Sequence, residues 1–158
     1  MSNVLIGIIG VILFIGLALA GALFLGGRFS QSQTESEAAR LVTEGSQISS
    51  AYDLYSVNEG RYPDGAGSGA ATPSDAKLDE LVAKGYLKDK PAGGKPTSGY
   101  QNTWYIDETK GAALTLIGDD SRSANVCKAA RRQVGFTDDV KACNASDIQD
   151  NDPCCLAA

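Results

Sequence analysis

The sequence predicts an α+β fold. A long N-terminal α-helix has a protruding apolar half and an amphipathic half that packs on a small antiparallel β-sheet, and a disulfide-tied C-terminal region follows. Three observations lead to this prediction: Met1 to Gly27 contains no charged side chain, helical periodicity continues without a proline to Asn58, and all four cysteines follow residue 126. We expect two parts, an apolar helix over residues 1–28 and a globular domain over residues 29–158 that includes the amphipathic half of the helix.

The N-terminal segment is long enough to cross a membrane. It is apolar from Val4 to Leu25, and about 20 apolar residues span the hydrocarbon core of a bilayer. The alternative is a secretory signal, which has a basic start and an apolar core of about 7–15 residues. Because Met1-Ser2-Asn3 contains no basic residue and the apolar run is longer, we expect an uncleaved membrane helix.

Small residues recur within this helix at intervals of four. They form two runs on neighbouring faces, and the five residues are Gly16, Ala18, Ala20, Ala22 and Gly26. Small side chains at this spacing let helix backbones approach closely in an apolar medium. We therefore expect these faces to pack against other helices, and the alternative is the ordinary composition of a membrane helix.

Beyond Arg28 the helical pattern becomes amphipathic. Apolar residues recur at helical steps, at Ala38, Leu41, Val42, Ile48, Tyr52 and Tyr55. The helix is expected to end at Asn58-Glu59-Gly60, because glycine is favoured directly after a helix and Pro63 follows. A continuous helix to this point contains about 60 residues and measures about 90 Å.

Shorter elements are expected after this helix. Apolar spacing predicts a helix over residues 76–84, and alternating β-formers predict a hairpin of strands over residues 104–107 and 112–118. A further helix is expected over residues 123–135, with Arg131 and Arg132 on its polar side. The remaining tail, residues 136–158, is expected to be rich in loops and held by cysteines.

The cysteines are Cys127, Cys143, Cys154 and Cys155. An even number clustered beyond a membrane segment indicates disulfides in an oxidising compartment. Reduced thiols are one alternative, and a zinc site is another, although the spacing lacks the usual short knuckles. Since the neighbouring cysteines rarely bond each other, two pairings remain open: Cys127 with Cys154 and Cys143 with Cys155, or the exchanged partners.

Composition argues against several classes of function. Histidine is absent, which removes the commonest general base. The formal net charge of −5 disfavours a nucleic-acid backbone as the main partner. Lys128, Arg131 and Arg132 could form a basic patch for DNA or an acidic neighbour, but a solvated helix face is the favoured interpretation. We expect no enzymatic activity, no specific nucleic-acid partner and no cofactor.

Three segments resemble a known family. NEGRYP at Asn58–Pro63 and LDELVAKGYLKDKP at Leu78–Pro91 resemble the segments that join the long helix to the sheet in type IV pilins and the related type II secretion pseudopilins. Residues 126–135 resemble the cysteine-bearing helix of type IVb-like pilins. The resemblance covers most of the chain, and the order of the three segments is more specific than any one of them. Two departures are Leu5, where the family usually has Glu, and the lack of proline in the apolar helix.

The resemblance implies a structural subunit. Such a subunit resides as a monomer in the bacterial inner membrane and polymerises, with the pilus assembly machinery, into an extracellular helical filament that serves adhesion, motility or DNA- and phage-related functions. The partner would be further copies of the chain, and Met1 would be the mature N-terminus, with N-methylation. The alternative is a single-pass, membrane-anchored periplasmic accessory protein or pseudopilin component of a secretion system.

The same resemblance raises calcium binding, because pseudopilins of the major type can bind this ion. Asp147, Asp150 and Asp152 offer a dense local set of carboxylates. A Ca²⁺ site needs about six to eight converging oxygens, and a solvated acidic loop is the favoured interpretation of this segment.

Overall fold

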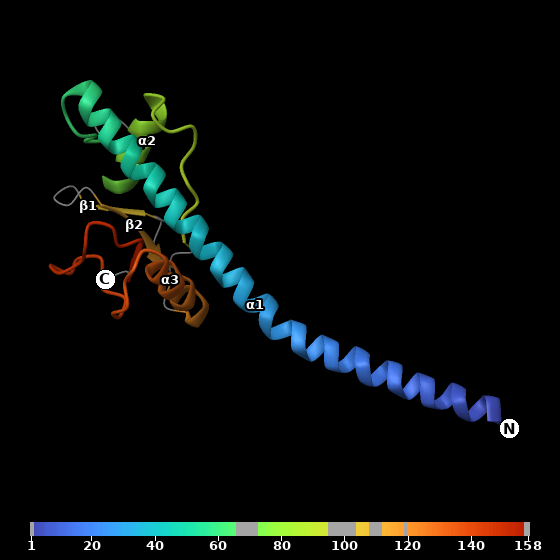
Figure 1. The fold of residues 1–158 in the computed structure, drawn as a ribbon. Helices are drawn as coiled ribbons and strands as arrows, with labels where there is room; N and C mark the ends of the chain where they lie inside the picture. Colours follow the sequence, from blue (N-terminus) through green and yellow to red (C-terminus); the bar gives the residue numbers. More distant parts are fainter. Residues whose placement is uncertain (1, 66–72, 95–103, 108–111, 119, 157–158) are drawn as a thin grey trace. The chain divides into compact units, whose positions relative to one another are not determined.

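The computed structural model describes residues 2–65, 73–94, 104–107, 112–118 and 120–156. The elements in order are α1 (Ser2–Glu59), α2 (Pro73–Ala83), β1 (Trp104–Asp107), β2 (Ala112–Ile117), α3 (Ser121–Gln133) and β3 (Cys154–Leu156) (Figure 1). The α+β class, the long N-terminal helix and the disulfides of the C-terminal region are confirmed. The chain divides into two compact units, Met1–Thr34 and Glu35–Ala158, called here the N-terminal and C-terminal units.

The N-terminal unit contains the apolar part of α1, and the large apolar side chains that the structure describes there are exposed. Its large apolar residues from Val4 to Phe24 range from 49% exposed at Ile9 to 83% at Leu23. The most apolar 18-residue stretch has a mean hydropathy of 2.8. By length and composition this helix suffices to cross a bilayer, and a signal sequence near an N-terminus would share these properties.

In the C-terminal unit, one side of α1 contributes to the main apolar cluster. Its buried residues from Ile48 to Tyr55 share this cluster with residues of α2, β1 and β2: Leu78, Leu81, Trp104, Ile106 and Ala113. The helix ends at Glu59 as expected, because Gly60 adopts a left-handed φ of +70° and donates its N–H to the Ser56 carbonyl at 3.0 Å.

The sheet is mixed, so the predicted antiparallel sheet is wrong in part. Strands β1 and β2 form the expected antiparallel pair, with Trp104 opposite Thr115. Strand β3 lies on the other side of β2 and pairs with it in parallel, with Thr115 opposite Cys154. Parallel strands need a long crossover, and α3 with the segment after it supplies this connection. Strand β3 itself lies in the tail that the sequence pattern predicts to be rich in loops.

Both short helices begin earlier than the apolar spacing predicts. Helix α2 starts at Pro73, because a proline at the first helical position loses no hydrogen bond. Helix α3 starts at Ser121, because the carboxylate of Asp120 caps it by accepting the Ser123 N–H at 2.6 Å. These starts replace the expected ones at residues 76 and 123.

Candidate functional site

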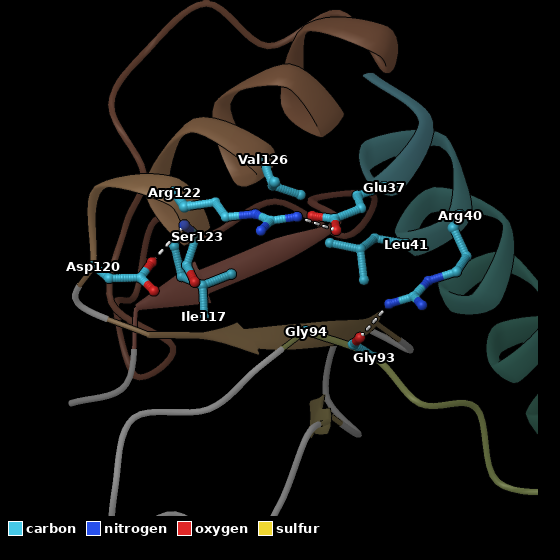
Figure 2. A pocket seen from close by; sticks show the side chains of 10 residues that line it. All are labelled: Glu37, Arg40, Leu41, Gly93, Gly94, Ile117, Asp120, Arg122, Ser123 and Val126. Carbon is cyan, nitrogen blue, oxygen red and sulfur yellow. Dashed lines mark hydrogen bonds and ion pairs between the residues drawn. The ribbon is translucent and has the colours of Figure 1, made fainter. Parts of the chain in front are cut away.

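A cavity of about 280 Å³ opens in the C-terminal unit where α1, α3, the end of β2 and the Gly93–Gly94 segment meet (Figure 2). Its lining residues are Glu37, Arg40, Leu41, Gly93, Gly94, Ile117, Asp120, Arg122, Ser123 and Val126. These residues come from four separate stretches of the chain. Sequence analysis did not single out this set, because the spacing within any one stretch gives no sign of the others.

The inner wall of the cavity is apolar. Leu41 of α1, Ile117 of β2 and Val126 of α3 are 2%, 2% and 6% exposed. Leu41 and Val126 belong to one apolar cluster that joins α1 to α3. Because these side chains are buried among their neighbours, packing fixes the wall in place.

Two arginines connect α1 to the other sides of the cavity, as Figure 2 shows. Arg122 of α3 donates from Nη2 to Glu37 Oε1 at 2.7 Å. Arg40 of α1 donates from Nη2 to the Gly93 carbonyl at 2.9 Å, and its Nε lies 3.4 Å from Glu44 Oε1. The side chains of Arg40 and Arg122 are 53% and 63% exposed, so the rim is charged and accessible to solvent.

The Gly93–Gly94 segment is held in place by hydrogen bonds from its backbone N–H groups to side chains. The Gly93 N–H donates to Glu44 Oε2 at 2.8 Å, and the Gly94 N–H donates to Thr115 Oγ1 at 2.5 Å. A Cβ atom at Gly94 would lie 2.7 Å from the Leu116 carbonyl oxygen. Glycine is therefore required for this segment to approach β2.

The four cysteines form two disulfides on β3. Cys127 of α3 bonds Cys154, and Cys143 bonds Cys155, which is the first of the two pairings that the sequence leaves open. Adjacent residues of a strand point to opposite faces of a sheet. Strand β3 is therefore tied from both faces, to α3 on one and to the segment around Cys143 on the other.

Arg131 is buried, so the interpretation of this residue as part of a solvated face is wrong. Its guanidinium donates to Asp152, donates to Asp138 Oδ1 at 2.5 Å, and lies 5.0 Å from the centre of the Phe136 ring. Lys128 and Arg132 are exposed. The partners of Arg131 lie outside α3, and the helical periodicity therefore contains no sign of its burial.

The pKa values of the two carboxylates that pair with Arg131 are shifted in opposite directions. The hydrogen bond from Arg131 lowers the pKa of Asp138. Burial raises the pKa of Asp152, and the charge of Arg131 acts in the opposite direction.

The acidic residues considered for calcium do not form a common site among the described residues. No group of three or more His, Cys, Asp or Glu side chains within the described ranges could hold a metal ion. Asp147 accepts from Lys141 Nζ at 2.7 Å, Asp152 pairs with Arg131, and Asp150 is exposed. The favoured interpretation of a solvated acidic loop is therefore wrong for the buried Asp152, and the expected lack of a cofactor stays a prediction.

The five small residues of the apolar helix are exposed in the N-terminal unit. A Cβ atom at Gly16 or Gly26 would meet nothing within 4 Å. Their packing against other helices stays a prediction. Met1, the expected site of N-methylation, lies outside the described residues.

No family model, curated protein or solved structure matches the chain. The resemblance to pilins therefore depends on the three sequence segments. Asn58–Pro63 covers the end of α1, Leu78–Pro91 covers most of α2 and the segment after it, and residues 126–135 lie in and directly after α3.

Proposed function

We propose that this chain is a structural subunit that leaves a membrane and polymerises into an extracellular helical filament of the type IV pilus kind. The observation that carries the proposal is the apolar surface of α1 from Val4 to Phe24, which is exposed along a helix that continues into a folded unit. Exposed apolar surface of this extent requires another apolar environment. Lipid supplies one such environment, and a bundle of identical helices supplies another.

Exchange between these two environments explains how one helix serves both states. A helix satisfies its own backbone hydrogen bonds in lipid, and it keeps them in a helical bundle. Transfer from lipid to the bundle therefore changes the free energy little, and close packing at the faces of Gly16 and Ala22 favours assembly. Repeated contact between two unlike surfaces gives an open filament when the rotation does not close.

The C-terminal unit suits the outside of such a filament. We infer that the amphipathic half of α1 packs on the sheet, because a Cβ atom at Gly45 would lie 3.3 Å from the Ala113 carbonyl and 3.6 Å from the Trp104 ring. The two disulfides favour an oxidising, extracytoplasmic compartment.

A second candidate is a membrane-anchored periplasmic accessory protein. The cavity of Figure 2 favours this function, since an apolar pocket with a charged rim is typical of a ligand-binding site. On this hypothesis the apolar helix anchors the chain and the C-terminal unit binds a ligand by itself.

Shearing of surface appendages from the native host tests the first proposal. We expect filaments in which this chain is the repeating unit, identified by mass spectrometry and by near-atomic imaging. Removal of residues 1–28 should abolish the filaments. A chain that stays in the membrane fraction while the host produces filaments of another protein would overturn the proposal and favour the anchored accessory protein.

A further inference from the structure

We propose that a second cavity, at the C-terminal end of α3, binds a phosphate group through Lys128, Arg132 and the buried Arg131. The cavity measures about 130 Å³, and it is lined by these three cations of α3 and by residues 136–139 of the segment after it. The inference goes beyond the proposed function, because the site lies within the C-terminal unit of a single chain and does not require polymerisation.

Arg131 brings an unused hydrogen-bond donor to this cavity. Its side chain is 2% exposed, and its Nη1 and Nη2 atoms donate to Asp152 and Asp138. Its Nε atom is the one buried side-chain nitrogen or oxygen among the described residues that has no hydrogen-bond partner. A buried donor without an acceptor is unfavourable, so a ligand oxygen that reaches Nε gains a hydrogen bond that the protein leaves unmade.

The unused N–H lies on the edge of the guanidinium that borders the cavity. Nε–H and an Nη2 N–H point along the same edge, which matches two oxygens of a carboxylate or a phosphate. Nη2 donates to Asp138, and Asp138 lines the cavity. Nε itself is covered, so a phosphate oxygen reaches it when the Asp138 side chain, which is 46% exposed, turns aside. Asp138 would keep a partner in Lys141, whose Nζ lies 3.5 Å from its Oδ2.

Lys128 and Arg132 add two exposed cations to the lining of the cavity. They lie one turn apart on α3, and neither forms an ion pair with another residue that the structure describes. Like charges at this spacing repel each other, and an anion between them relieves the repulsion. A cation in the last turn of a helix also offsets the partial charge of its carbonyls. This effect accounts for Arg132 but not for Lys128, which precedes the last turn.

The carboxylates of the lining do not neutralise these two cations. Asp138 is already paired with Arg131 and Lys141. One further carboxylate, that of Asp139, then faces two cations. The balance of charge at the cavity therefore favours an anion.

Size and donor geometry favour a phosphate group over other occupants. A single water needs only about 10–15 Å³ of cavity, and drug-sized ligands need about 300–1,000 Å³. A carboxylate has two oxygens, which the edge of one arginine occupies fully. A phosphate group has further oxygens for a lysine and a second arginine, and both residue types bind phosphate in proteins. The phosphate group can come from free inorganic phosphate or from a phospholipid headgroup.

NMR spectroscopy of the full ¹⁵N-labelled chain in micelles of a nonionic detergent tests the site. The Nε–H signal of Arg131 reports the contact directly. Inorganic phosphate should shift this signal and saturate the shift, whereas chloride at the same ionic strength should leave it in place. Phosphatidylglycerol added to the micelles in a separate titration tests the headgroup as the source.

A double variant removes the two exposed cations and keeps the buried cluster. Lys128→Gln combined with Arg132→Gln should lower the affinity for phosphate roughly tenfold, because two charged donors are lost. The Nε–H signal of Arg131 should persist in this variant, which shows that the fold around it is intact. The matched control is Lys88→Gln, which removes an exposed cation outside the cavity and should leave the affinity unchanged.

The outcomes decide the inference without reference to filaments. A saturable shift that weakens in the double variant but not in Lys88→Gln supports the site, and the titration that produces the shift identifies the source of the phosphate group. No shift with either source, or equal affinity of the double variant and the wild-type chain, overturns it. Since the chain is studied as a monomer in detergent, a failure of the proposed filament function leaves this result unaffected.

Discussion

The guanidinium of Arg131 on α3 is paired with the carboxylate of Asp152, two residues before β3, and each side chain is only 2% exposed. Cys127 lies one helical turn before Arg131 and bonds Cys154, two residues after Asp152. One turn of α3 therefore holds the same segment by a covalent bond and by a buried ion pair. This double connection ties β3 and the segment before it to α3.

Asp152→Asn should destabilise the C-terminal unit by about 3 kcal/mol, because removal of one partner leaves the other charge buried without full compensation. Trp104 is the single tryptophan and is 1% exposed, so its fluorescence reports unfolding of the full chain in urea and detergent. Asp150→Asn, at an exposed position of the same segment, is the control and should change stability little. Equal stability of the two variants would contradict the role of the buried pair.

The two disulfides should contribute unequally to stability. Their sequence separations are 27 residues for Cys127–Cys154 and 12 for Cys143–Cys155, and loop-closure entropy predicts about 3.5 and about 3 kcal/mol. Paired Cys→Ala substitutions of each bridge, compared by urea unfolding, should therefore cost more for the first pair. A larger loss on removal of Cys143–Cys155 would show that native contacts outweigh chain entropy here.

Local patterns predicted the elements of this fold well where the signal lies within one segment. The glycine and the nearby Pro63 predicted the end of α1 at the Asn58-Glu59-Gly60 sequence, and β-formers predicted the antiparallel pair of β1 and β2. Strand β3 was missed, because its three residues are too few to show a period and its partner β2 precedes it by a whole helix.

Contacts between segments that are far apart in the chain could not be predicted from the sequence, for a related reason. The helical pattern places Arg131 on the polar face of α3. Its burial is possible because Asp138 and Asp152, which follow α3 in the sequence, pair with its guanidinium. The cavity combines α1, the Gly93–Gly94 segment, β2 and α3. No single stretch contains its pattern, although the adjacent glycines mark the place where the backbone approaches β2.

Glu80 should control the acid stability of the region where α1 meets α2. Burial acts to raise the pKa of Glu80, but hydrogen bonds from Tyr55, Gly65 and Arg61 outweigh it and lower the pKa below the ordinary 4.5. A carboxylate with a lowered pKa stabilises the fold above its unfolded pKa, and this stability is lost as pH falls through the folded value. Glu80→Gln should therefore cost roughly 1–2 kcal/mol near pH 7 and weaken the loss of stability below about pH 4.5.

A second measurement on the same variant identifies the hydrogen bond itself. The bond to Glu80 raises the pKa of Tyr55 from 10.0 to about 12. In Glu80→Gln the Tyr55 phenol, followed by NMR with labelled tyrosine, should titrate closer to 10.0. An unchanged Tyr55 titration would contradict the contact even if stability fell.

Gly65 should be far less tolerant of a side chain than Gly60. Both have a left-handed φ, +73° and +70°, but a Cβ atom at Gly65 would lie 2.5 Å from Ala76 Cβ, whereas one at Gly60 would meet nothing within 4 Å. Gly60→Ala should cost about 1 kcal/mol from backbone strain alone. Gly65→Ala should cost at least about 1 kcal/mol more, because overpacking adds to this strain, and urea unfolding of the two variants measures the difference.

The last prediction concerns assembly and the two faces of the apolar helix that carry small residues. Ala22→Leu should leave membrane insertion intact, because leucine is at least as apolar. It should lower the filament yield roughly tenfold, because the larger side chain overpacks a close helix contact, which costs about 1–3 kcal/mol, and 1.4 kcal/mol corresponds to tenfold. Leu17→Phe adds volume on a face away from both small-residue runs and is the control. Quantification of sheared filaments against total membrane-bound chain compares the two variants. If Ala22→Leu assembles as well as the wild-type chain while Leu17→Phe does not, the packing face lies on the opposite side of the helix.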